Sequence, residues 1–269
     1  MAGTARQTRA LAIAQPVPAP QERREAAAVV ERAASPPPAF GIPLDHLPAR
    51  GAGRWTADAW LLLRQGGDTA TRSGAVPPTY GASQAGAVLR YRLKSPAPAA
   101  PTLYLRATTA LDDRAAREAA AGIAARPLRR IPLVAMAEVR LHAFGGETEL
   151  RPAVMLVSEF PPLDLGRAVR AESYLQAGYV DGRFATGFAD GQVRLTREVR
   201  RFERGGVSAG AGAWGGVQRD AGRIDVGPTA TVDLRLGPAA ARLAFDYRFR
   251  AAGDAAPDSG PAVTLSTGF

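Results

Sequence analysis

The sequence predicts an all-β protein: an antiparallel transmembrane β-barrel of about 12 strands over residues 51–269. Segments of about ten residues alternate between apolar and polar side chains, as strands with one apolar and one polar face do. The chain of 269 residues is long enough for about twelve such strands and their turns, and this strand length suits a membrane barrel. The polar face also carries Arg, Asp and Glu in neighbouring segments, as ion pairs across a lumen require.

Residues 1–50 are predicted to be a separate linker, rich in Pro and Ala. The proline runs at 15–20 and 35–38 indicate extended chain. Residues 21–34, rich in Ala, Glu and Arg, predict one short helix. The apolar run at 10–14 is too short for the core of a signal peptide. We therefore expect a misplaced start, a fragment of a longer chain or a protein that is not exported.

The alternating segments follow one another from residue 54 to the C-terminus. In the segment 240–250, Leu243 and Phe245 lie on one face, and Arg242 and Asp246 lie on the other. Segment 117–126 is so rich in Ala that the sequence also allows a helix there. The predicted strands are 54–64, 83–93, 102–110, 117–126, 131–141, 148–158, 170–180, 188–199, 206–216, 223–236, 240–250 and 260–269.

The two faces of these strands favour a membrane barrel over a soluble sandwich. A soluble sheet buries its apolar face, whereas a membrane barrel turns that face to lipid. The apolar face here contains many Ala, which lipid tolerates but a soluble core would experience as missing volume. Aromatic residues lie near strand ends, as interfacial girdles do: Trp55, Tyr91, Tyr179, Phe249 and Phe269. A soluble all-β binding module stays the alternative.

Composition excludes several classes of function. The formal net charge is +9, but the basic residues are nearly all Arg, scattered at alternate strand positions without a basic block. We therefore predict no nucleic-acid binding. The absence of Cys rules out disulfides and thiolate chemistry, and two His leave little material for a metal site. No run of about 18 apolar residues predicts a transmembrane helix.

Three patterns that could carry chemistry are weak. Gly206-Val-Ser-Ala-Gly210 matches the nucleophile elbow, which needs a strand–turn–helix and partner Asp and His, but it lies in a Gly/Ala strand. His142 reads as a solvated or lumen-lining residue. Asp112-Asp113, and Asp254 with Asp258, could bind calcium, but solvated loops are the simpler interpretation. We predict no enzymatic activity, no cofactor and no metal.

The polar face predicts the residues that line the lumen. They support either an Arg–carboxylate ladder that holds the barrel together or an anion-preferring lumen, since rings of Arg select negative solutes. The second interpretation makes a generic anion-preferring porin an alternative function. The candidates are Arg90, Arg92, Arg106, Arg140, Arg151, Arg194, Arg235, Arg242, Arg248, Arg250, Glu138, Glu172, Asp233 and Asp246, with Glu118, Glu198 and Asp225 on the same face.

If the C-terminus faces the periplasm, every connection is assigned to one side. The outer connections are then 65–79, 111–116, 142–147, 181–187, 217–222 and 251–259. The inner ones are 94–101, 127–130, 159–169, 200–205 and 237–239. Outer loops are usually the longer ones, which holds for 65–79 and 251–259 and fails for 159–169.

The end of the chain resembles known membrane barrels. The terminal strand that ends in Phe269 resembles the closing strand of Gram-negative outer-membrane barrels, where that end is the signal for the barrel-assembly machinery. Three segments resemble the C-terminal barrel of the bacteriophage adsorption protein A (NfrA-type) family: 80–93, 188–191 with 210–216, and 249–269. The resemblance covers about residues 50–269.

This resemblance implies a location and a role. In that family the barrel follows periplasmic tetratricopeptide repeats, as in related outer-membrane exporters of exopolysaccharides. It implies a non-enzymatic barrel in the cell outer membrane, in contact with its lipid, that acts as a surface receptor or export barrel in phage adsorption or exopolysaccharide export. Connections 65–79 and 251–259 would meet a phage or an anionic polysaccharide. A periplasmic TPR protein would supply the repeats that this sequence lacks.

Overall fold

The computed structural model describes residues 53–65, 82–94, 101–111, 116–128, 130–144, 146–182, 185–219 and 221–269. The predicted linker and helix in residues 1–50 lie outside these ranges, as does nearly all of connection 65–79. The described residues form thirteen strands. Within them there is no helix long and apolar enough to cross a membrane.

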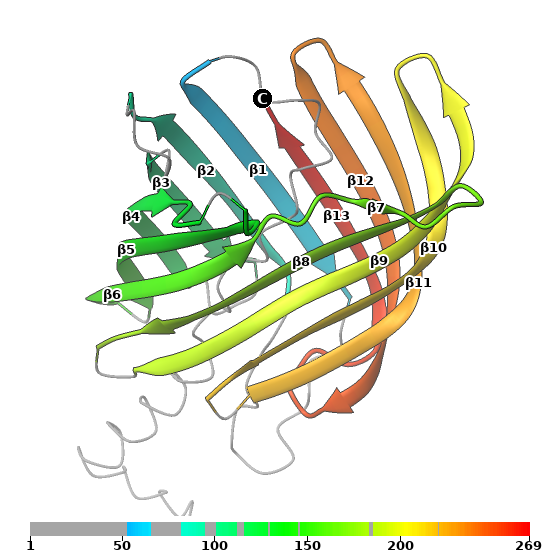
Figure 1. Cartoon of the computed structure of the whole chain (residues 1–269). Coiled ribbons are helices and arrows are strands. Elements are labelled where there is room, and N and C mark those ends of the chain that lie inside the picture. The colour runs from blue at the N-terminus through cyan, green and yellow to red at the C-terminus, as the bar shows by residue number, and fades with distance from the viewer. Residues whose placement is uncertain are drawn as a thin grey trace, which may run out of the picture.

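The strands form one closed antiparallel barrel (Figure 1). Strands that follow one another in sequence pair, except that β6 pairs with β8 because the short β7 lies only against β8, and β1 pairs with β13 to close the ring. Apart from β7, every strand has at least nine residues, so the predicted barrel of about twelve strands is confirmed. The strands are β1 (Trp55–Arg64), β2 (Gln84–Arg92), β3 (Thr102–Ala110), β4 (Arg117–Ala125), β5 (Leu133–Phe144), β6 (Glu147–Ser158), β7 (Leu163–Asp164), β8 (Val169–Val180), β9 (Thr186–Phe202), β10 (Gly205–Gln218), β11 (Ala221–Leu236), β12 (Ala239–Gly253) and β13 (Gly260–Gly268).

Some predicted connections are partly strand in the structure. The predicted turn 200–205 is mostly strand, because β9 runs to Phe202 and β10 begins at Gly205. A register shift opposite Val207 and Ser208 disturbs the alternation there, which explains why the strand was missed. Connection 159–167 contains the short β7. The Ala-rich segment 117–126 is the strand β4, so the strand prediction is confirmed there and the helix alternative is wrong.

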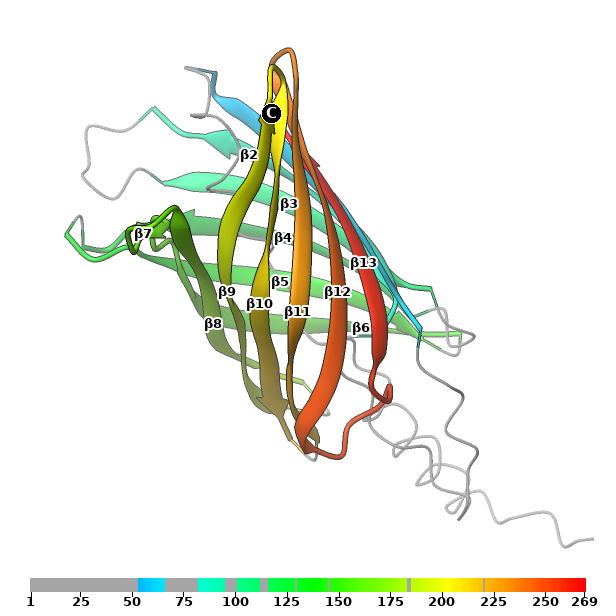
Figure 2. The same ribbon diagram turned by 90° about the vertical axis from the view of Figure 1, so that its right-hand side faces the viewer.

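The long strands give the barrel an uneven rim. The β9–β10 and β11–β12 hairpins project beyond the other strands at the end where the chain terminates (Figure 2). At the junction of β6 and β8 only five residue pairs are in register, fewer than at any other junction of long strands in the described part of the barrel.

The polarity of the barrel is inverted relative to a soluble protein. Leu105 on the outside is 60% exposed, whereas Arg140 on the inside is 3% exposed. We call the outward aliphatic side chains the apolar belt: Leu63, Leu89, Leu103, Leu105, Ile123, Val139, Leu141, Leu150, Val154, Leu156, Leu175, Val193, Leu195, Ile224, Val226 and Leu265. Exposing these apolar side chains to water is unfavourable, whereas contact with lipid chains is not. The fold is therefore that of a transmembrane barrel.

Inward aromatic rings cover glycines on the barrel wall. Trp60 lies over Gly86, Tyr104 over Gly122, Phe188 over Gly178 and Trp214 over Gly212. A Cβ atom at any of these glycines would come within 2.8 Å of the ring. The glycines therefore create the shallow grooves in which these rings lie flat against the wall.

Candidate functional site: a charged, constricted lumen

One cluster of inward charges lines the wall formed by β3, β4 and β5. Arg106 donates hydrogen bonds to Glu118 at 2.8 Å and to Glu138 at 2.7 Å. Arg140 donates to Glu138 at 2.5 Å, and the Tyr104 hydroxyl donates to Glu138 at 2.8 Å. Three donor groups thus converge on two carboxylates, and the cluster ties three adjacent strands together.

A second cluster, which we call the central cluster, consists of Arg194, Asp246, Arg248, Thr229 and Trp214. Asp246 accepts hydrogen bonds from Arg194 at 3.2 Å, Arg248 at 3.0 Å and Thr229 at 2.7 Å. The two guanidinium groups also lie over the Trp214 ring, 5.6 Å and 4.6 Å from its centre. One carboxylate and one aromatic face therefore hold two buried arginines at the middle of β9 and β12.

The third cluster lies in the mouth at the end where the chain terminates. Arg242 of β12 donates to Glu172 of β8 at 2.8 Å and to Asp233 of β11 at 2.5 Å. The contact to Glu172 joins strands separated by three others, so it is a chord across the lumen. These residues line a polar mouth cavity of about 630 Å³, together with Arg170, Glu198 and Arg201.

The lumen narrows between the central cluster and the opposite wall. Side chains of Trp60 on β1 and Gln84 on β2 meet Gln192 and Arg194 on β9 around a void of about 20 Å³. A cavity of this size has room for about one water molecule. Side chains from nearly opposite walls thus meet at this level and constrict the lumen.

At the other end, the connection between β12 and β13 turns into the barrel. Arg223 donates to the carbonyl of Ala255 at 2.7 Å and to that of Pro257, and it pairs with Asp225 at 2.8 Å. Arg64 pairs with the same Asp225 at 2.9 Å. Ala255 is fully buried. The expectation that 251–259 forms an outer recognition loop is therefore wrong for its middle, which these arginines draw inward.

The remaining predicted lumen residues have different surroundings. Arg90 pairs with Asp58, Arg250 pairs with Asp258 at 2.8 Å, and Arg151 is buried. Arg92 and Arg235 lie near strand ends and are exposed, as is Glu198, which pairs with Arg201. Arg64, Arg223 and Asp58 were missing from the prediction, although they share the inward parity of their strands.

The weak chemical patterns gain no support. The Gly206–Gly210 segment lies inside β10, without the strand–turn–helix that a nucleophile needs. His142 is buried in β5, opposite Glu118 and Glu149 in the register. Among the described residues no group of three His, Cys, Asp or Glu is placed to hold a metal ion. Asp112 and Asp113 lie outside the described residues.

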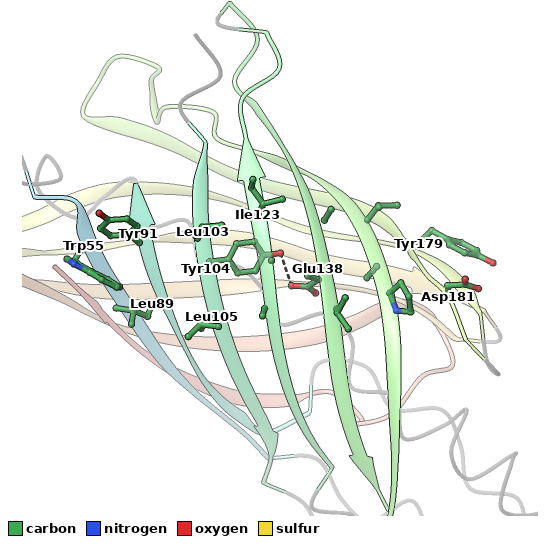
Figure 3. A pocket seen from close by; sticks show the side chains of 17 residues that line it. Trp55, Leu89, Tyr91, Leu103, Tyr104, Leu105, Ile123, Glu138, Tyr179 and Asp181 are labelled. Atoms are coloured by element: carbon green, nitrogen blue, oxygen red, sulfur yellow. Dashed lines mark hydrogen bonds between the residues drawn. The ribbon is translucent and has the colours of Figure 1, made fainter. Parts of the chain in front are cut away.

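The outer wall carries a second concave feature, which we call the wall groove (Figure 3). It has a volume of about 960 Å³, and part of its outward lining comes from the apolar belt, with Leu103, Leu105 and Ile123 in the middle. Trp55 and Tyr91 lie at one end, and Tyr179 and Asp181 lie at the other. Below Gly122, the inward Tyr104 closes the wall.

No protein-family model and no curated protein matches this chain. Among solved structures, it is similar to the NanC porin (8% identity, 79% of this chain and 98% of that chain, TM-score 0.38). It is also similar to a bacterial polysaccharide outer membrane secretin (10%, 79% and 97%, 0.42) and to LpxR from Salmonella typhimurium (10%, 80% and 99%, 0.41). Similarities this distant assign no ligand and no activity.

Proposed function

We propose that this chain is a non-enzymatic, integral outer-membrane β-barrel that acts as a closed surface receptor, of the kind used in phage adsorption. The apolar belt supports the membrane location, because only lipid can cover such a surface on a closed barrel. The observation that carries the receptor role is the constriction at Trp60, Gln84, Gln192 and Arg194. Side chains that meet across the lumen at this level suit a barrel that binds at its surface rather than one that conducts.

The paired charges argue against the generic anion-preferring porin. A selective ring needs cationic groups that are free to meet the solute. Here Arg106, Arg140, Arg194, Arg242 and Arg248 each pair with an inward carboxylate. Their positive charge is thus largely neutralised within the wall, and the ladder interpretation accounts for them.

The partners of the proposed receptor follow from its role and from an orientation with the C-terminus facing the periplasm. A phage or an anionic polysaccharide would meet the end opposite the C-terminus. Phe269, which is exposed and hydrogen-bonds through its backbone to Ala57, would present the signal to the barrel-assembly machinery. A periplasmic TPR protein would face the mouth cavity. Exopolysaccharide export through this barrel would require the constriction to open.

Conductance of the full chain in planar bilayers tests the closed lumen. We expect no steady channel current from the wild-type protein. We expect Trp60→Ala to produce currents, because it removes one of the side chains that meet Gln192 and Arg194 at the constriction. A matched control is Trp55→Ala, which removes an outward ring. A steady open-channel current from correctly folded wild-type protein would contradict the closed-receptor proposal.

A further inference from the structure

We propose that the wall groove binds one membrane glycerophospholipid, with its phosphate on Arg54 and its acyl chains along the apolar lining. This inference rests on the proposed membrane location. It adds a specific lipid site to a surface that would otherwise only contact bulk lipid.

The shape of the wall groove suits acyl chains. Ala121 and Ala137 lie in its floor, while Leu103, Leu105 and Val154 stand out on its sides. A volume of about 960 Å³ is within the range of sites that hold a ligand of several hundred daltons. The groove is continuous with the apolar belt, so a lipid can enter it from the bilayer without crossing a polar surface.

One end of the wall groove carries a positive charge held in place. Arg54 donates a hydrogen bond from Nη1 to the Tyr91 hydroxyl at 2.9 Å, and its guanidinium lies 6.0 Å from the centre of that ring. The Tyr91 ring in turn contacts Trp55, with 4.7 Å between ring centres. An aromatic pair beside an Arg at a strand end is suited to the headgroup level of a bilayer, where phosphate accepts hydrogen bonds from guanidinium groups.

The opposite end of the wall groove carries a negative charge. Asp181 lies there beside Tyr179, and Figure 3 shows both at the far side from Trp55 and Tyr91. A phosphate would be repelled by the Asp181 carboxylate and attracted by Arg54. The charges therefore fix the direction of the lipid, with its headgroup at the end of the barrel where the chain terminates.

Native mass spectrometry of the full chain in detergent, titrated with phosphatidylglycerol, tests this site. We expect one phosphatidylglycerol to remain bound to the wild type. Arg54→Gln should weaken binding about tenfold, the loss expected for one charge-assisted hydrogen bond. Ala137→Trp should abolish the bound lipid, because the new ring fills the floor of the wall groove.

Two control variants separate this site from bulk lipid contact. Arg197→Gln removes an exposed arginine near the same end of the barrel, and Ala213→Trp enlarges an outward residue of β10; neither residue lines the wall groove. Both controls should bind as the wild type does. Equal losses in control and groove variants, or lipid retention by Ala137→Trp, would overturn the inference.

The failure of this inference is distinguishable from that of the proposed function. Each variant is first checked for a heat-dependent shift on a gel, which reports the folded membrane barrel independently of lipid. If the shift is present and lipid binding does not depend on the groove, only the lipid site is refuted. If the wild type shows no shift, the membrane location itself is refuted, and this inference falls with it.

Discussion

Asp246 is the residue on which the central cluster depends. Its carboxylate is inaccessible to solvent and pairs with Arg194 and Arg248, which are themselves buried. Two guanidinium groups held by one carboxylate in a low-dielectric interior need that carboxylate, since an unpaired buried charge is costly. These ion pairs mainly offset the cost of burying two arginine charges inside the barrel and add little net stability.

We therefore predict that Asp246→Ala lowers the free energy of unfolding by about 3 kcal/mol, the cost of leaving a buried charge without its partner. Guanidinium unfolding in detergent micelles, followed by tryptophan fluorescence, measures this change. Asp258→Ala is the matched control, because Asp258 pairs with Arg250 at the surface, and its effect should stay below about 1 kcal/mol. Equal effects of the two substitutions would show that the central cluster is not buried as described.

At the scale of single strands, Gly227 in β11 meets a backbone constraint. A Cβ atom there would lie 1.8 Å from the carbonyl oxygen of Tyr247 on β12, and backbone cannot move aside as a flexible side chain can. The register of β11 against β12 shifts nearby, between Ile224 and Asp225, which marks a local irregularity of this pairing. The residue type is thus set by the close approach of two strands.

We predict that Gly227→Ala destabilises the barrel by about 1–3 kcal/mol through overpacking, or reduces the yield of folded protein. Gly222→Ala, in the same strand, should change stability by less than about 0.5 kcal/mol, because its Cβ would meet only Val217 at 3.8 Å. Refolding yield and denaturant midpoint of both variants give the comparison. Wild-type behaviour of Gly227→Ala would mean that β11 and β12 are farther apart than in this structure.

The strands could be predicted because each carries its own alternation. Residues 223–236 and 240–250 alternate almost without a break, and they become β11 and β12 with boundaries shifted by a few residues. Prediction failed where the pattern is interrupted. The bulge in β9 puts Glu198 and Arg201 on the same face, and the sequence shows only a cluster of charges. β7 has two residues, too few for any period.

The ion pairs of the lumen were beyond prediction from sequence. The inward parity of Arg242 and Glu172 follows from alternation, but their contact joins β12 to β8, seventy positions apart in sequence. Which ion pairs form across the lumen depends on how the barrel closes and how its strands are staggered. The burial of Ala255 inside the barrel could not be predicted either, because a polar, Pro-containing segment between two strands is typical of a solvated loop.

At the scale of the whole molecule, the barrel separates an apolar outer face from a charged inner face. The apolar belt covers the outside, and arginines with carboxylates fill the inside. A soluble sheet protein with these residues would expose the belt to water or bury charges against apolar atoms. Closing the sheet in a bilayer places the apolar face in lipid and the charged face in the lumen, and it leaves no strand edge in lipid.

Heat-modifiability of the full chain tests whether these strands form a closed transmembrane barrel. The protein is refolded into detergent, and its gel mobility is compared before and after boiling. A transmembrane barrel held by backbone pairing around a closed ring should resist the detergent, run at one position unboiled and shift on heating. A chain that instead folds in plain buffer without detergent and shows no shift would contradict the account, because its apolar face would then be a core rather than a surface for lipid.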